Sequence, residues 1–302
     1  MRIGILGREQ SGSATPLEDC IADARRAADD GFATFWLPQA YGLDVMTTLA
    51  VVGREVPGIE LGTAVLPIYA RVPVSLASAV RTVQAAVGGR FTLGLGLSHI
   101  GMVQLVYGAS FEYPVRDLRE YLTALMPLVR GEPVDVAGET YRVAGQVTVQ
   151  GVDGGSVLVA ALGEQTLRVT GRLADGTITW VTGPRTLEEH TIPTICAAAE
   201  AAGRPRPRIV AGLPVCVTAD ADAARARADR VFQIYGLLPS YRAMLDREGA
   251  RGPGDVAVVG DEDAVAAQLA HLGAIGVDDF AASPFGTPDE RAATRALLTA
   301  GL

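Results

Sequence analysis

The sequence predicts an α/β fold in which eight parallel strands and their helices form a (β/α)8 barrel of the TIM type. The first observation is that short apolar runs alternate with segments of helical periodicity, which is typical of βα units. The second is the length of 302 residues, which suits such a barrel as one domain. The third is that only two segments, 131–155 and 236–257, break the alternation. We therefore expect one domain over residues 1–302 with two insertions, and an open doubly wound sheet is the alternative.

The predicted elements follow one another in a regular order. Strands are expected at 2–7, 32–38, 59–66, 91–97, 156–161, 176–181, 208–217 and 278–282. Helices are expected at 16–30, 43–54, 74–87, 112–130, 164–173, 187–202, 219–235, 262–272 and from 288 onward. Thr15 with Glu18 and Thr287 with Glu290 have the spacing of a capping box, and Asp261 is a typical N-cap. Two-residue valine spacings among glycines predict a hairpin in 131–155, and residues 236–257 are expected to be helical.

The composition is that of an ordinary globular protein, with 49% hydrophobic and 20% charged residues. The formal net charge of -8 argues against a general nucleic-acid binder, which needs a basic face. The amino terminus runs directly into a predicted strand, and polar residues and glycines interrupt the apolar stretch 91–107. We therefore expect no secretion signal, no membrane span and a cytoplasmic location. The widely spaced Cys20, Cys196 and Cys216 predict free thiols.

Residues 94–99, Gly-Leu-Gly-Leu-Ser-His, match two known motifs in part, but each motif lacks a required residue. A dinucleotide loop needs a glycine where His99 stands, and a nucleophile elbow needs a glycine in place of Ile100. The three histidines are too few and too dispersed for a zinc site, so no metal is expected. His190 and His271 are predicted as solvent-facing helix residues.

In such a barrel the chemistry lies at the carboxyl ends of the strands, and this rule selects few residues. Segments 96–98 and 163–166 combine glycines, hydroxyls and a helix start, which is typical of phosphate binding by backbone N–H groups. The alternative is that these glycines only allow tight turns. The other strand ends are largely apolar and favour a flat ring system over a sugar. Loops 39–44, 99–112 and 236–257, which contain or adjoin several aromatic residues, are expected to line the opening.

The ordered set of strand-end motifs resembles the bacterial luciferase-like flavin and deazaflavin oxidoreductases, from residue 1 to about 300. The motifs are GFATFWLPQ (31–39), LGTAVLPIYARVP (61–73), GRFTLGLG (89–96), VAALGEQTLR (159–168), ADG (174–176) and VGDED (259–263). Within that family the chain is most similar to the branch that uses the deazaflavin coenzyme F420, and FMN is the alternative cofactor.

The resemblance implies that the coenzyme ring lies across the barrel mouth, against a non-prolyl cis peptide bond that maps onto Ala64–Val65. The coenzyme phosphate is expected near residues 96–98 and 163–165, and Gln39 and Trp180 are expected to border the ring. The implied binding surface comprises Gln39, Ala64, Val65, Gly96, Leu97, Ser98, Ala161, Leu162, Gly163, Glu164, Gln165 and Trp180. The family also implies a homodimer.

Two departures from the family pattern bear on the substrate. Sugar-phosphate dehydrogenases of the family have an Asp-His pair where this chain has Gln39-Ala40, and relatives often have His where Val72 stands. A sugar-phosphate substrate, and a base supplied by that Asp-His pair, are therefore not expected here. A proton donor is expected by position alone from Glu9, Tyr41, Tyr69 or His99, or from water. Of these, Glu9, Tyr69 and His99 are the predicted catalytic residues.

The favoured activity is hydride transfer from the reduced coenzyme to a C=C or C=N bond of a small molecule. The sequence permits a small organic acid, an imine or a hydrophobic enone as substrate. An FMN-dependent monooxygenase on the same scaffold is the first alternative. A ring-binding protein without turnover is the second.

Overall fold

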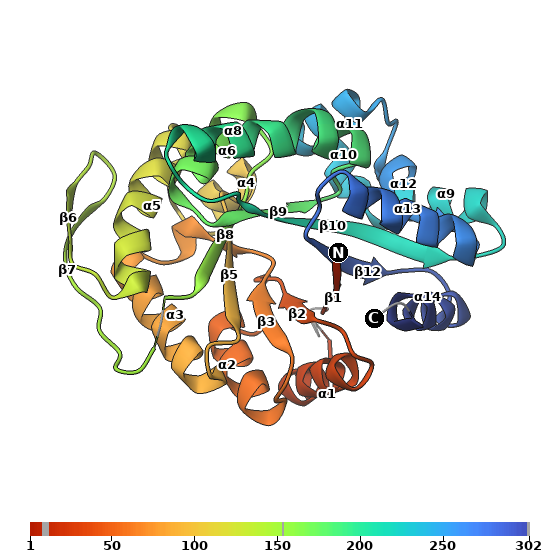
Figure 1. The fold of residues 1–302 in the computed structure, drawn as a ribbon, viewed down its shortest axis with the longest axis horizontal. Coiled ribbons are helices and arrows are strands. Elements are labelled where there is room, and N and C mark those ends of the chain that lie inside the picture. The colour runs from red at the N-terminus through yellow and green to blue at the C-terminus, as the bar shows by residue number, and fades with distance from the viewer. Residues whose placement is uncertain (8–11, 153, 301–302) are drawn as a thin grey trace.

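The computed structural model describes residues 1–7, 12–152 and 154–300, and its centre is a closed parallel barrel (Figure 1). The barrel strands are β1 (Arg2–Leu6), β2 (Thr34–Leu37), β3 (Glu60–Thr63), β5 (Phe91–Gly96), β8 (Ser156–Ala160), β9 (Gly176–Trp180), β10 (Arg208–Val217) and β12 (Asp279–Pro284). Each pairs in parallel with its neighbours, and β12 pairs with β1 to close the ring. The predicted barrel and all eight predicted strands are confirmed, and the open sheet is wrong.

The helices surround the barrel in chain order, as a ring of crossover connections requires. They are α1 (Pro16–Asp29), α2 (Val45–Glu55), α3 (Pro73–Val87), α4 (Ile100–Leu105), α5 (Pro114–Arg130), α6 (Glu164–Leu173), α7 (Pro184–Thr186), α8 (Ile192–Ala201), α9 (Ala221–Val231), α10 (Gln233–Leu237), α11 (Pro239–Glu248), α12 (Pro253–Val256), α13 (Glu262–Ala274) and α14 (Pro288–Ala300). A π-helical turn over residues 187–191 joins α7 to α8.

Two short strands extend the sheet beyond the prediction: β4 (Leu66–Pro67) pairs with β5, and β11 (Val258–Gly260) pairs with β10. No helix in these ranges has the length and apolarity that crossing a membrane would need.

Two of the three predicted helix caps are confirmed. Asp261 accepts from the Ala264 N–H at 2.9 Å, and Thr287 and Glu290 bond each other's backbone N–H groups in a complete capping box. The box predicted at Thr15 is wrong, because the Thr15 side chain makes no cap hydrogen bond. Its hydroxyl lies 3.5 Å from Asp19 instead.

The first predicted insertion is a hairpin of β6 (Val134–Ala137) and β7 (Arg142–Gly145), and two carboxylates of α5 hold its turn. Asp117 accepts from the Thr140 hydroxyl at 2.7 Å. Glu120 accepts from the backbone N–H groups of Glu139, Thr140 and Tyr141 at 2.8–3.2 Å. Burial alone would raise the pKa of Glu120, but these three donors hold it below its usual value. The hairpin is thus attached to α5 by charge-assisted hydrogen bonds. The second insertion is helical as predicted and contains α11 and α12.

The barrel interior is filled by one large side chain and several smaller ones. The fully buried Trp36 of β2 packs there against Leu158, Ile178, Val210 and Ala281. A Cβ at Gly62, on the neighbouring strand, would overlap the Trp36 indole, so the glycine makes room for it. The interior is therefore a packed core rather than a channel.

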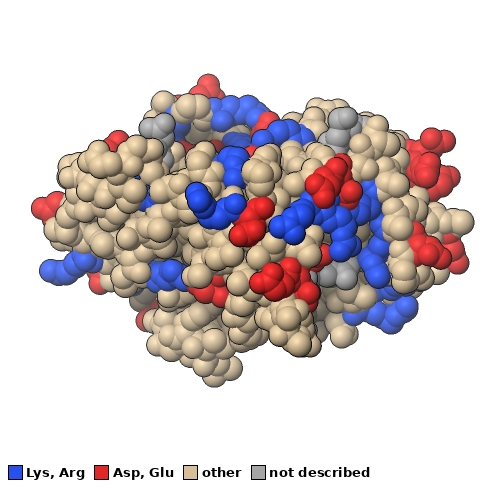
Figure 2. Space-filling view, turned by 90° about the horizontal axis from the view of Figure 1, so that it is seen from below, with Lys and Arg blue, Asp and Glu red and all other residues tan. Residues whose placement is uncertain are grey.

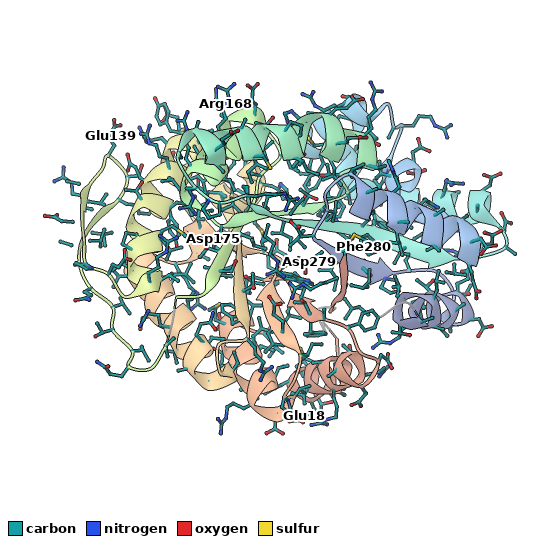
Figure 3. The ribbon with its side chains drawn as sticks, in the orientation of Figure 1. Glu18, Glu139, Arg168, Asp175, Asp279 and Phe280 are labelled. Carbon is teal, nitrogen blue, oxygen red and sulfur yellow. The ribbon has the colours of Figure 1, made fainter. Side chains whose placement is uncertain are left out.

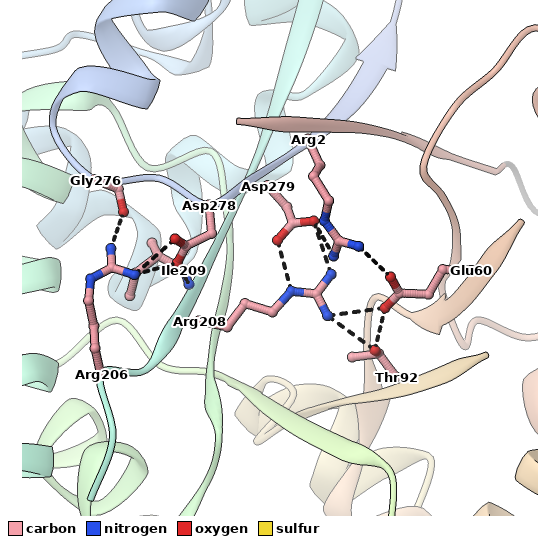
Figure 4. A network of polar contacts seen from close by, with 9 residues as sticks. All are labelled: Arg2, Glu60, Thr92, Arg206, Arg208, Ile209, Gly276, Asp278 and Asp279. Atoms are coloured by element: carbon pink, nitrogen blue, oxygen red, sulfur yellow. Dashed lines mark hydrogen bonds and ion pairs between the residues drawn. The ribbon is translucent and has the colours of Figure 1, made fainter. Parts of the chain in front are cut away.

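A polar network closes the barrel at the amino-terminal ends of the strands (Figure 4). Asp279, buried at the start of β12, binds Arg2 at 2.6 Å and Arg208 at 2.8 and 3.0 Å. Glu60 binds the same two arginines at 2.9 and 3.1 Å and accepts from the Thr92 hydroxyl at 2.6 Å. In Figure 3, Asp279 lies near the middle of the molecule, whereas Arg168 and Glu139 project from its periphery. Four strands (β1, β3, β10 and β12) therefore meet through charge pairs and β5 through a hydroxyl, at the end opposite to the one where such barrels carry chemistry.

Arginine and acidic side chains are interspersed on the face shown in Figure 2 rather than separated by sign. Ion pairs join arginines to carboxylates across the described surface and at the barrel end; in one of them Nη1 of Arg206 donates to both carboxylate oxygens of Asp278. This face offers no broad basic surface of the kind that a nucleic acid backbone needs.

Candidate functional site

The third barrel strand is interrupted at its carboxyl end by a cis peptide bond between Ala64 and Val65, the position that the family resemblance implies. The Ala64 N–H donates to the Leu37 carbonyl at 2.9 Å, and the Val65 carbonyl accepts from the Gln39 N–H at 3.4 Å. Both residues pack on the inner barrel core and are only half-buried. The interruption thus presents the backbone and the Val65 side chain at the barrel mouth.

The glycines of β5 make room for this interruption. A Cβ at Gly96 would lie 2.8 Å from Cγ2 of Val65, and one at Gly94 would collide with the Thr63 carbonyl. The Thr63 hydroxyl donates to the Gly94 carbonyl at 2.7 Å and accepts from its N–H at 2.8 Å. The motif Gly-Leu-Gly is therefore explained by the close approach of two strands at the mouth.

Two non-glycine residues that directly follow barrel strands have left-handed backbone conformations. Ser98, after β5, has φ of 60°, and Val181, after Trp180 of β9, has φ of 51°. Such conformations cost on the order of 1–3 kcal/mol for a β-branched residue and cluster at functional sites. The ends of β5 and β9 are therefore candidate functional positions at the barrel mouth.

The helix α6 begins at the end of β8 with the predicted phosphate-binding segment. Gly163 is its N-cap, and the first intrahelical bond is donated by Leu167 to the Gly163 carbonyl. The N–H groups of residues 164–166 donate to no residue that the structure describes. The Glu164 side chain pairs with Arg168 at 2.5 Å on the surface. The helix therefore offers its backbone N–H groups, not the Glu164 carboxylate, to an anion.

His190 was expected to face solvent, and this is wrong: it is 8% exposed, whereas His271 is exposed as predicted. Its Nε2 lies 3.1 Å from the Leu162 carbonyl, beside the N-cap of α6. Since a carbonyl only accepts, Nε2 carries the proton in this contact. The π-helical turn at 187–191 adds a residue to one helical turn and rotates the side chain inward. The local sequence Glu-Glu-His gives no sign of this.

The predicted residue Gln39 lies at the mouth, but its side chain is engaged within its own loop. Its Nε2 donates to the carbonyls of Ala40 and Leu43 at 2.9 and 3.4 Å, and its Oε1 accepts from the Val45 N–H at 3.0 Å. The side chain therefore shapes the loop and caps α2, and the backbone N–H contacts the cis peptide.

His99 and Trp180 lie at the ends of β5 and β9 and are joined through two aromatic rings, one just before the second insertion and one within it. The His99 ring lies 5.8 Å from Tyr241, and Trp180 lies 5.9 Å from Tyr235. Burial lowers the pKa of His99, so that its imidazole is neutral at pH 7. Leu97 and Ala161 adjoin these strand ends, so the predicted set comes together at one end of the barrel.

The Tyr69 side chain is bonded to α5 rather than to the residues described above. Its hydroxyl donates to Asp117 at 3.1 Å, and burial and this carboxylate raise its pKa. It lines a cavity of about 300 Å³ between the loop after β4, α5 and the hairpin turn. Tyr41 is 75% exposed, with its hydroxyl on Met102 Sδ. Glu9 lies outside the described residues.

Comparison with known proteins places this geometry in a family. The model of the luciferase-like monooxygenases matches residues 1–296. The chain belongs to this family. It is 28% identical, over 89% of its length and 91% of the relative, to the 5,10-methylenetetrahydromethanopterin reductase of Methanolobus tindarius.

Solved structures of the luciferase-like fold agree with this assignment. The coenzyme F420-dependent tetrahydromethanopterin reductase of Methanopyrus kandleri has a TM-score of 0.81 at 22% identity, covering 99% of this chain and 97% of that one. The EDTA monooxygenase of Chelativorans sp. BNC1 has a TM-score of 0.80 at 17% identity, covering 100% and 94%. Reductases and monooxygenases thus share this fold. In the described ranges of this chain, no three His, Cys, Asp or Glu side chains are grouped as metal ligands would be.

Proposed function

We propose that the protein is a coenzyme F420-dependent oxidoreductase that reduces a C=C or C=N bond of a small molecule. The observation that carries the proposal is that the half-buried, apolar Ala64 and Val65 and the open N-terminus of α6 both lie at the carboxyl end of the barrel strands. A relative that matches nine-tenths of the chain is a methylenetetrahydromethanopterin reductase.

The residues at the mouth fit a flat ring with a phosphate-bearing tail. Ala64 and Val65 offer a small, apolar contact surface, kept open by Gly96. The N–H groups of Glu164 and Gln165 fit an anion, because they donate to no other described residue. Ser98 follows β5, the strand that pairs directly with β8, which leads into α6. A deazaflavin bound by these residues supplies hydride chemistry.

The chain's own contribution is binding, water exclusion and proton supply. Among the described proton-donor candidates, His99 is the one in ring contact with this mouth, because Tyr69 is bonded to Asp117 and Tyr41 points to Met102. We therefore propose His99 as the general acid in its protonated imidazolium form, because a neutral ring could give up its N–H proton only by becoming an imidazolate. Removing a general acid lowers a rate by roughly 10²-fold or more.

The direct experiment is a fluorescence titration of the protein with oxidised F420 and, separately, with FMN. We expect saturable binding of F420 in the micromolar range and much weaker binding of FMN. Preference for FMN would favour the second candidate, an FMN-dependent monooxygenase, because a monooxygenase shares this fold. Oxygen consumption with reduced FMN would then be measured next.

The anion site is tested by a matched pair of variants at the first position of α6. Glu164→Pro removes one backbone N–H at a position where proline is tolerated in a helix, whereas Glu164→Ala keeps it. We expect Glu164→Pro to weaken F420 binding by about tenfold relative to Glu164→Ala. Binding of the phosphate-free deazaflavin riboside should be equal in both variants. Equal F420 affinity in the two variants would remove α6 from the site.

A further inference from the structure

Five aromatic rings from separate parts of the chain form a continuous row at the carboxyl end of the barrel. His99 follows β5 and Trp180 ends β9, while Phe232 follows α9, Tyr235 lies in α10 and Tyr241 lies in α11. Successive rings touch: His99–Tyr241 at 5.8 Å, Tyr241–Tyr235 at 4.9 Å, Tyr235–Trp180 at 5.9 Å and Trp180–Phe232 at 5.8 Å. The helices α10 and α11 thereby fold back toward the strand ends (Figure 1).

All five rings are half-buried, so each still presents part of its surface to solvent-accessible space. This distinguishes them from Trp36 and Tyr121, which are fully buried. Most of the ring pairs are edge-on, with interplanar angles of 65–74°. Edge-on packing leaves ring faces available for a further planar group.

None of the five rings carries a charge at neutral pH. Burial lowers the pKa of His99 and raises the pKa values of Tyr235 and Tyr241. Three of the charged side chains of α11 are held by other partners. Arg242 binds Asp246 and two backbone carbonyls, and Glu248 accepts from the N–H groups of Arg185 and Thr186.

We propose that the hydride acceptor of this enzyme is an uncharged, planar, conjugated molecule of the enone type, bound against this row of rings. This inference rests on the proposed function. Ring faces and edges stabilise such a molecule, and the tyrosine and histidine groups offer neutral hydrogen bonds to its carbonyl. A carboxylate placed against these rings would lose its hydration, and the rings themselves offer it no cation. Of the substrate classes that the sequence permits, the structure thus selects the enone over the organic acid.

The test uses two probes of the same shape that differ in charge: 4-phenylbut-3-en-2-one and cinnamate. Binding to the protein saturated with oxidised F420 is measured by calorimetry, so that no turnover occurs. We expect the ketone to bind at least about tenfold more tightly than cinnamate. Equal affinities, tighter binding of cinnamate, or no binding of the ketone would each overturn the proposal.

Variants connect the preference to the rings. Tyr235→Leu and Tyr241→Leu should each weaken ketone binding by about tenfold, and Tyr235→Phe should retain it, because the ring is kept. Tyr113→Leu, at an exposed ring under Arg116, is the matched control and should change nothing. Unchanged ketone binding in Tyr235→Leu and Tyr241→Leu would overturn the assignment to this row. The ketone titration is repeated without coenzyme, so that the row of rings is tested independently of F420. Failure of F420 to bind would then contradict the proposed function alone.

Discussion

Replacing Gly96 by alanine tests the link between the glycines of β5 and the surface at the cis peptide. The added Cβ would lie 2.8 Å from Cγ2 of Val65 and 3.6 Å from the Ala160 Cβ. Since an ordinary carbon–carbon contact is about 3.5–4.0 Å, Val65 has to move by roughly 0.7 Å or more. Overpacking of this kind costs about 1–3 kcal/mol. For a chain of this size we expect the melting temperature to fall by roughly 2–8 °C.

The assay is thermal unfolding by circular dichroism, together with the F420 titration. Because the moving residue is itself part of the proposed ring surface, coenzyme affinity should fall by about tenfold or more in the same variant. Gly101→Ala is the control, because a Cβ at Gly101 in α4 meets nothing within 4 Å. It should leave both quantities unchanged or raise the melting temperature slightly. If Gly96→Ala behaves like Gly101→Ala, Val65 is not held against β5 as described.

Three further changes test other parts of the molecule. Asp279→Asn should lower the free energy of unfolding by about 1–3 kcal/mol in denaturant titration, because Arg2 and Arg208 lose one of the two carboxylates that they share and keep only Glu60; an unchanged free energy of unfolding would contradict this. Glu290, whose pKa the Thr287 N–H and the other partners lower to about 2, stabilises the fold above the pKa of the unfolded chain, and that contribution is lost as pH falls toward 2. Glu290→Gln should therefore flatten the fall of melting temperature between pH 5 and pH 3, and an unchanged slope would exclude Glu290 as its source. His190→Leu should weaken F420 binding by about tenfold while His190→Gln, which can still donate to the Leu162 carbonyl, retains it; equal binding by the two would show that the hydrogen bond does not position α6.

The eight strands were predictable because each is a short apolar run between helical segments, a pattern that depends on local burial alone. The caps at Asp261 and Thr287 followed from residue type and spacing, whereas Thr15 has the same signature without the contact. The short strand β11 was missed. Its three residues become a strand only because β10 is long enough to pair with them.

The candidate site was predictable where it depends on backbone at strand ends and not where it depends on contacts between distant side chains. The cis peptide at Ala64–Val65 came from the family resemblance, and the close approach of Val65 then accounts for Gly96. The direction of Tyr69 toward Asp117 could not be predicted, because the two residues are 48 positions apart. The inward rotation of His190 depends on a π-helical turn, which no periodicity signals.

The charge network at the amino-terminal end of the barrel has a consequence for synthesis on the ribosome. Arg2, Glu60 and Thr92 are made early. Arg208, which binds Glu60 and Thr92, follows these two residues in the chain by 148 and 116 positions. Asp279 emerges later still. Until then the emerging half-barrel exposes two open strand edges, and Glu60 has only one of its two arginine partners. The last strand to leave the exit tunnel therefore both pairs with the first and neutralises its arginine, so that the completed ring forms only after nearly the whole chain has been translated.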